Sequence, residues 1–234
     1  MNPNPKYLSF YYATTTTFPD ITLDPTKTAL LIIDLQNEFV SREIGEAAQF
    51  KAMGEWERWI PFHDRLDDIV VPNNKRLLDY FRANKMYVTY GRIACLLKNG
   101  ADRSPVQKSE GWNGMLLPVD EYKTQMVDEL APREGEIVVN KTTDSVVNGT
   151  NYVFLLKNMG IETVVVTGIV TDQCVASTVR DLADAGFKVI VVEDACASAD
   201  MELHHAELKI MNIIYCNVLS TNETLDVLKK FQKA

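Results

Sequence analysis

The sequence predicts an α/β fold in three layers (α/β/α), in which a mostly parallel, six-stranded sheet is covered by helices on both faces. Two observations predict it. Apolar runs typical of buried strands alternate, along the whole chain, with segments whose apolar residues recur at helical spacing. The 234 residues, of which 46% are hydrophobic, suffice for one domain with a large core, and no repeat or low-complexity linker divides them.

The six predicted strands are largely apolar runs bounded by polar or turn-forming residues. They are TALLIID (28–34), MYVTYG (86–91), EIVVNK (136–141), ETVVVTG (162–168), KVIVVED (188–194) and IIYCNVL (213–219). Between the second and third strands runs a long connection, 92–133, which is rich in Gly, Pro and Trp. Loops of this length in compact domains are often functional.

The predicted helices follow from apolar residues at helical spacing. They cover 66–84 across a break at Pro72, 152–160 with a stop at Gly160, a segment from about Asp172, 202–212 and 223–232. Each of them stands between two predicted strands or follows the last one, which is the order expected of a parallel sheet.

The domain organisation predicted is an irregular N-terminal arm, 1–27, followed by a single domain, 28–234. The arm contains YYATTTTF (11–18), which is β-prone. Two placements are open for this stretch, because it can pack across a neighbouring subunit or extend the arm's own domain as a strand.

Composition excludes several classes of function. The net charge of −8 and the pI of about 5.0, without a Lys/Arg cluster, argue against nucleic acid as a partner. No apolar run approaches membrane-spanning length, and the first twenty residues lack a basic leader and an apolar signal core, so we expect a cytoplasmic protein. The four cysteines are widely spaced, and the three histidines match no zinc motif. Reduced thiols and the absence of a metal cofactor are therefore expected.

Three chemically capable residues follow predicted strands directly. Asp34 closes the first strand, Lys141 closes the third, and Cys174 comes shortly after the fourth. In an open parallel sheet, ligands bind beyond the carboxyl ends of the strands. The fold is therefore expected to gather these residues at one edge.

Each of these residues has a catalytic and a structural interpretation. A cysteine in a helix's first turn meets backbone N–H groups and the positive end of the helix dipole, which lower its pKa and favour the nucleophilic thiolate; the alternative is a small packing residue. Asp34 can take the thiol proton or cap a turn, and Lys141 can pair with Asp34 or point to solvent. The other three cysteines, Cys95, Cys196 and Cys216, are interpreted as structural, with Cys216 inside a strand.

Three short sequence motifs around these residues resemble those of the isochorismatase-like cysteine hydrolase superfamily. The first is D-x-Q-x-x-F, matched by Asp34, Gln36 and Phe39. The second is a lysine followed by S-x-x-x-x-T, which here starts at Lys141. The third, G-x-x-T-x-x-C-V-x-x-T-x-R-D, is matched in full from Gly168. The resemblance extends from about residue 28 to about residue 228.

The resemblance implies a catalytic triad of Asp34, Lys141 and Cys174. It also implies a cis peptide bond just before Thr171, between Ile169 and Val170, and an oxyanion hole formed by the backbone N–H groups of Val170 and Cys174. Substrate contacts are expected from Gln36, Phe39, Arg92 and Trp112. By family analogy we also expect a homodimer or homotetramer.

Departures from the family pattern narrow the range of substrates that we expect. Nicotinamidases of this superfamily carry an Asp/His metal site after the second strand, and the segment 90–105 contains no histidine. Members that act on isochorismate can lack the cysteine. The chain is therefore expected to be a metal-free amidohydrolase for a small linear amide or a ureido or carbamoyl compound, of the ureidoacrylate, biuret, triuret or N-carbamoyl amino acid type. A redox-active or regulatory thiol protein and a nicotinamidase- or isochorismatase-type hydrolase remain as alternatives.

One further segment is singled out by its aromatic residues. The stretch 50–66 carries Trp56, Trp59 and Phe62. It is expected to form a wall of the substrate pocket or a contact between subunits.

Overall fold

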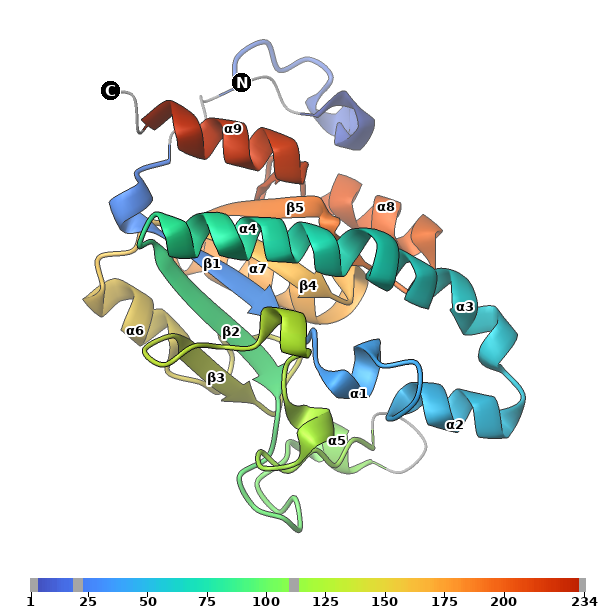
Figure 1. Ribbon diagram of the computed structural model, residues 1–234. Coiled ribbons are helices and arrows are strands. Elements are labelled where there is room, and N and C mark those ends of the chain that lie inside the picture. Colours follow the sequence, from blue (N-terminus) through green and yellow to red (C-terminus); the bar gives the residue numbers. More distant parts are fainter. Residues whose placement is uncertain (1–3, 19–22, 110–113, 232–234) are drawn as a thin grey trace.

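The computed structural model describes residues 4–18, 23–109 and 114–231 and confirms the predicted three-layer architecture (Figure 1). Its sheet has six strands in the order β3-β2-β1-β4-β5-β6, and every neighbouring pair is parallel. The strands are β1 Thr28–Ile33, β2 Tyr87–Ile93, β3 Ile137–Lys141, β4 Thr163–Ile169, β5 Lys188–Ala197 and β6 Asn217–Leu219. The order reverses between β1 and β4, and in this class of sheet a ligand crevice opens at the carboxyl end of such a point.

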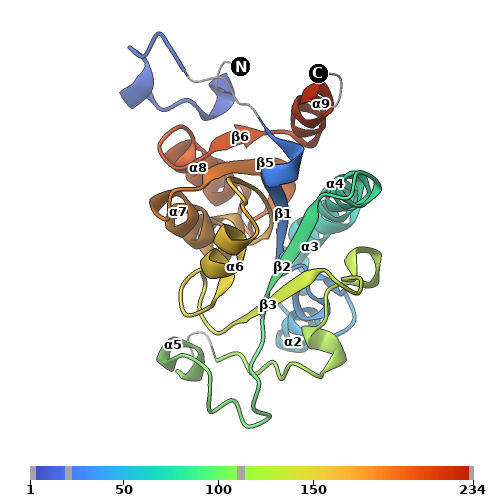
Figure 2. The same cartoon turned by 90° about the vertical axis from the view of Figure 1, so that its left-hand side faces the viewer.

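Helices cover both faces of the sheet, as Figure 2 shows end on. The helices α3 (Trp56–Arg65), α4 (Val71–Ala83) and α9 (Thr221–Phe231) lie on one side, and α6 (Tyr152–Asn158), α7 (Ala176–Asp184) and α8 (Met201–Met211) lie on the other. Three further α-helices lie in the described chain, namely α1 (Asn37–Val40), α2 (Glu46–Met53) and α5 (Pro105–Lys108). All three belong to connections that follow the carboxyl ends of β1 and β2.

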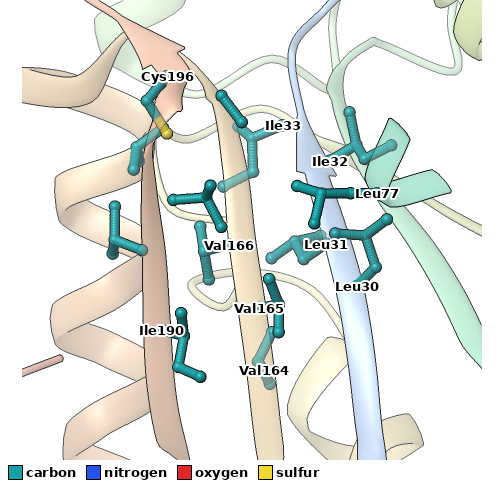
Figure 3. Close-up of a cluster of buried hydrophobic side chains, with 14 of the residues drawn as sticks. Leu30, Leu31, Ile32, Ile33, Leu77, Val164, Val165, Val166, Ile190 and Cys196 are labelled. Carbon is teal, nitrogen blue, oxygen red and sulfur yellow. The ribbon is translucent and has the colours of Figure 1, made fainter. Parts of the chain in front are cut away.

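The core is centred on β1 and β4, whose residues are buried without exception. Figure 3 shows side chains of this core, with Leu31 of β1, Val165 of β4 and Ile190 of β5 among them. Burying one such side chain contributes about 1.5 to 3 kcal/mol. Strands covered on both faces need apolar residues at every position, which explains why these two read as continuous apolar runs.

Pro72 does not break the helical segment, contrary to the prediction. The chain stays helical from α3 through a π-helical turn, Leu66–Val70, into α4. Pro72 stands in the first turn of α4, directly after the π-helical turn, whose widened backbone accommodates a residue without an N–H. The pocket-side aromatics of α3 and the sheet-side residues of α4 are therefore parts of one rod.

The sixth strand is shorter than predicted. Residues 212–216 form a tight turn in which Ile213 adopts a left-handed φ of 81° and its N–H donates to the carbonyl oxygen of Cys216 at 2.7 Å. The extended segment begins only at Asn217. Cys216 thus precedes the strand instead of lying inside it.

The described part of the arm packs on its own domain. Its β-prone stretch is not a strand, since Phe10–Tyr12 form a 3-10 turn and residues 15–18 have no regular structure. Tyr7 is 1% exposed, and its carbonyl oxygen accepts a bond of 3.1 Å from Asn212 Nδ2. Aromatic burial at Tyr7 therefore decides where the arm lies, and β propensity does not.

No helix within the described ranges has the length and apolar character needed to cross a bilayer.

Candidate active site

Strand register brings the three predicted residues to one edge of the sheet. Ile33, the last residue of β1, pairs with Gly168 of β4, and Ile93 of β2 pairs with Lys141 of β3. The residues that follow β1 and β4 therefore emerge side by side at the point where the strand order reverses. Lys141 reaches them from the far side of β2.

The side chains of Asp34, Lys141 and Cys174 meet in a buried cluster. Lys141 Nζ lies 2.8 Å from Asp34 Oδ2 and 3.3 Å from Cys174 Sγ, and it donates to the carbonyl oxygen of Thr143 at 3.2 Å. The three side chains belong to residues that are only 1% to 5% exposed. The ammonium thus meets three acceptors, which matches its three N–H donors and compensates its burial.

The backbone of Asp34 is bent to aim its carboxylate at this cluster. Asp34 has a left-handed φ of 52°, a conformation that Asp tolerates better than most residues but that still costs about 1 kcal/mol. Its Oδ1 accepts from the N–H of Ile93 at 3.0 Å, and its own N–H donates to the carbonyl oxygen of Gly91 at 2.9 Å. The carboxylate is therefore fixed from the β2 side as well.

Cys174 sits in a sharp corner between β4 and α7. The Ile169–Val170 peptide bond is cis, as the family resemblance implied, and residues Thr171–Val175 form a π-helical turn before α7 begins. The carbonyl oxygen of Val170 accepts from the N–H groups of Gln173 and Val175, at 3.1 and 3.3 Å. These bonds hold the turn closed around the thiol.

The corner is supported from beneath by a buried histidine. Thr171 Oγ1 lies 2.8 Å from His204 Nδ1 of α8, and both residues are completely buried. Burial, with the nearby charge of Arg65 next in importance, lowers the pKa of His204 to about 3, so its ring is neutral. A neutral ring can exchange a hydrogen bond with the threonine and fix the start of the nucleophile turn.

The expected depression of the thiol pKa is wrong for the resting protein. Burial, with a contribution from the carboxylate of Asp34, raises the pKa of Cys174 well above its ordinary value, and the charge of Lys141 offsets this only in part. Loss of water outweighs the helix dipole because the side chain is 5% exposed. The resting nucleophile is therefore a thiol, and it needs a base.

Asp34 and Lys141 have the charges that this task requires. Burial raises the pKa of Asp34, while the ammonium of Lys141 and a hydrogen bond with Cys174 act in the opposite direction. Burial alone would lower the pKa of Lys141, but its carboxylate and sulfur neighbours outweigh it and raise that pKa. A carboxylate of raised proton affinity beside a thiol, under a permanent cation, is suited to move one proton back and forth.

A cavity of about 400 Å³ opens above the thiol. Its lining includes Asp34, Ile93, Val170 and Cys174 from the strand ends and the corner. The N–H groups proposed for the oxyanion hole thus belong to residues of the cavity wall. A volume of this size holds a small organic molecule.

The aromatic segment 50–66 forms part of the cavity wall. Trp59 and Phe62 of α3 line it, and Phe50 stacks on Trp59 with ring centroids 4.1 Å apart and planes 7° from parallel. Trp56 packs instead against His63, with ring centroids 4.8 Å apart. Phe39, a predicted substrate contact, also lines the cavity.

Gln36 and Arg92 do not reach the cavity, which corrects their expected role as substrate contacts. Gln36 is completely buried; its Nε2 donates to the carbonyl oxygens of Ile93 and Thr124, and its Oε1 accepts from the N–H of Ile93. Arg92 binds the side chains of Asn140 and Gln125. Both residues tie the loop after β2 to the strand ends. Trp112 lies outside the described residues.

Four acidic residues of the cavity wall, Glu46, Asp144, Asp172 and Asp200, were not predicted from the sequence. Asp144 Oδ1 lies 3.9 Å from Cys174 Sγ, and Glu46 and Asp172 line the same cavity. A signal was present for two of them, because Asp144 follows Lys141 by three residues and Asp172 precedes Cys174 by two. Glu46 comes from α2, whose position over the strand ends is a tertiary feature.

Several known proteins are similar to this chain in sequence or in fold. The family model described as isochorismatase domain matches residues 28–223. The uncharacterized isochorismatase family protein YwoC of Bacillus subtilis (strain 168) is 29% identical over 209 residues, 89% of this chain and 98% of that protein. The ureidoacrylate amidohydrolase RutB of Agrobacterium fabrum is 31% identical over 196 residues, 75% of this chain and 78% of that protein. The crystal structure of a cysteine hydrolase from Pseudomonas syringae pv. phaseolicola has a TM-score of 0.78 at 20% identity, covering 93% of this chain and 99% of that one.

Proposed function

The chain belongs to the isochorismatase family, and on this premise we propose that it is a metal-free cysteine amidohydrolase. It would cleave the C–N bond of a small linear amide or of a ureido or carbamoyl compound through a thioester on Cys174. The observation that carries the proposal is the position of Lys141 Nζ between Asp34 Oδ2 and Cys174 Sγ, beside a cavity of substrate size. The relative RutB is a ureidoacrylate amidohydrolase, which supports amide chemistry.

In the first half of the reaction, Asp34 takes the thiol proton as sulfur attacks the substrate carbonyl carbon. Lys141 stabilises the thiolate as it forms, because its ammonium is already 3.3 Å from Sγ. The carbonyl oxygen becomes an oxyanion and is bound by the N–H groups of Val170 and Cys174, each worth about 3 kcal/mol in the transition state. The C–N bond then breaks, and the protonated Asp34 gives its proton to the departing nitrogen.

In the second half, water hydrolyses the thioester. Asp34, ionised again, takes a proton from the water as its oxygen attacks the thioester carbon. The C–S bond breaks, the sulfur recovers the proton from Asp34, and the acid product leaves. An amide yields a carboxylic acid and a ureide yields a carbamic acid, with ammonia or an amine as the other product.

The test is ammonia release from ureidoacrylate, biuret, triuret, N-carbamoyl amino acids and nicotinamide. We expect the parent protein to release ammonia from at least one ureido compound, and Cys174→Ala to lose at least about 1,000-fold in rate. Cys95→Ala is the matched control, because it removes a buried thiol that is 1% exposed and lies outside the cavity lining. Full activity of the Cys174 variant would rule out the thioester mechanism.

Mass spectrometry separates this proposal from a regulatory thiol. Rapid quenching during turnover should show the parent protein carrying the mass of one acyl group on Cys174. A stable sulfenate on that thiol after mild peroxide, together with no hydrolysis of any compound in the panel, would favour the redox alternative.

A further inference from the structure

The wall of the cavity is dominated by carboxylates. Among the lining residues that the structure describes, five are acidic, Asp34, Glu46, Asp144, Asp172 and Asp200, and one is basic, Arg58. Asp34 is paired with Lys141. Asp200 caps α8 by accepting from the N–H of Glu202 at 2.8 Å, so part of its capacity is used within the protein. The other three acids come from separate segments near the nucleophile. Glu46 belongs to α2, Asp144 to the loop after β3, and Asp172 to the turn that contains Cys174.

Two of these acids lie close to the nucleophile in the fold. Asp172 Oδ1 is buried and finds no hydrogen-bond donor in the protein, although Asp172 belongs to the same five-residue turn as the nucleophile. Asp144 Oδ1 stands 3.9 Å from the sulfur. Neither carboxylate forms an ion pair with a described residue, so both add negative charge near the reacting sulfur.

Glu46 adds a third carboxyl group to the cavity wall. It is the first residue of α2, is partly buried, and makes no ion pair with any described residue. Burial, and then the charge of Glu38, raise its pKa to about 7. A cationic or donor-rich group beside Glu46 would restore its ionised form, whereas an anionic group would add a further repulsion.

The one basic residue among these lining residues is poorly placed to offset the negative charge of the cavity wall. Arg58 lies on the exposed side of α3, where water and salt screen its charge. Asp144 is also exposed, but its Oδ1 lies 3.9 Å from the sulfur, and Asp172 belongs to the same turn as the nucleophile. A substrate carboxylate would therefore meet like charges nearest the reacting carbon.

We propose that the cavity selects amides and ureides whose remainder is uncharged or cationic and rich in N–H donors, and that it rejects those with an anionic tail. The inference rests on the proposed function and names the substrate class of that same site. It separates this chain from a relative such as the ureidoacrylate amidohydrolase RutB, because ureidoacrylate carries a carboxylate. Biuret-like and aminoalkyl ureas fit, and N-carbamoyl amino acids do not.

The first experiment compares three ureas of matched length, N-(3-aminopropyl)urea, N-(3-hydroxypropyl)urea and N-(2-carboxyethyl)urea, with biuret beside them. We expect kcat/KM for the aminopropyl and hydroxypropyl compounds to exceed that for the carboxyethyl compound by about 100-fold, the size expected of one like-charge contact at short range. Equal or faster hydrolysis of the carboxyethyl compound would overturn the inference.

Binding to Cys174→Ala, measured by calorimetry, keeps the two proposals apart. The same order of affinities without turnover by the parent would retain the polarity of the site and reject the thioester chemistry. Tighter binding of the carboxyethyl compound, or no binding of any of the four, would reject the inference whatever the parent hydrolyses.

Variants that each remove one charge show which residues set the preference against a substrate carboxylate. Glu46→Gln and Asp172→Asn should each raise the ratio of carboxyethyl to aminopropyl hydrolysis by about 10-fold. Asp226→Asn removes one charge on α9, where the residue is exposed and remote from the cavity lining, and should leave that ratio as it is. An equal change in all three variants would mean that overall charge, and not the cavity wall, sets the preference.

Discussion

At the scale of single residues, the cluster of Asp34, Lys141 and Cys174 carries no net charge, because the two ions balance each other and the thiol is neutral. A buried carboxylate or a buried ammonium alone would lose its hydration without compensation, which costs several kcal/mol. Together, at 2.8 Å, the two ions satisfy each other and leave the thiol uncharged. The same balance that makes the site stable keeps a base beside the nucleophile.

Replacing Lys141 by Met should therefore destabilise the fold and not only stop catalysis. The variant leaves the Asp34 carboxylate buried without its cation, and we expect a loss of about 3 to 5 kcal/mol in the free energy of unfolding. Urea denaturation measures it.

The double variant Lys141→Met with Asp34→Asn should recover part of that loss, because no uncompensated charge remains. Both variants should be inactive. If the single variant were as stable as the parent, the ion pair would not be buried as described.

At the scale of elements, the approach of β4 to β1 sets the distance between nucleophile and base. Gly168 has a φ of 114°, and a Cβ built there would stand 2.0 Å from the carbonyl oxygen of Ile33. Ile33 is followed directly by Asp34. Glycine at this position is thus what allows the two strand ends to lie close enough for proton transfer.

We expect Gly168→Ala to destabilise the protein by about 3 kcal/mol or more and to lower kcat, because β1 must shift and Asp34 shifts with it. Gly186→Ala is the matched control. Gly186 also has a positive φ, 92°, but a Cβ there meets nothing within 4 Å, so only about 1 kcal/mol of backbone strain is expected. Thermal unfolding and steady-state rates measured on both variants provide the comparison, and equal losses would show that strain alone matters at Gly168.

At the scale of the whole molecule, the acidic cavity makes stability depend on pH. Glu46, whose pKa is raised from 4.5 to about 7, prefers to be protonated in the folded state. Its favourable contribution is therefore complete below about pH 4.5 and is lost as the pH rises through 7.

Glu46→Gln should remove this dependence. Between about pH 5 and about pH 8, the variant should gain about 1 to 3 kcal/mol of stability relative to the parent, the smaller values applying because Glu46 is only partly buried. Glu57→Gln, an exposed residue of α3, is the control. Urea unfolding at the two pH values checks it, and parallel profiles for all three proteins would contradict the assignment.

Much of this molecule is predictable from its sequence, and the reason is local. Apolar runs buried on both faces define the strands, and the residues that end them, Asp34 and Lys141, fall at one edge by the geometry of a parallel sheet. What depends on contacts between distant segments is not predictable in this way. Gln36 and Arg92 look like free polar residues until the loop after β2 closes over them, and Glu46 becomes a cavity residue only once α2 is placed.

The continuous helical rod from α3 to α4 has a consequence for how such a protein diversifies. The groups that break the bond come from strand ends and the corner after β4, whereas Trp59, Phe62 and Glu46 come from the single insertion between β1 and β2. At one end of this insertion α4 packs on the sheet, and at the other end α1 follows directly after β1. The range of substrates can therefore change during evolution through replacement of this one segment, while the catalytic residues at the strand ends are retained.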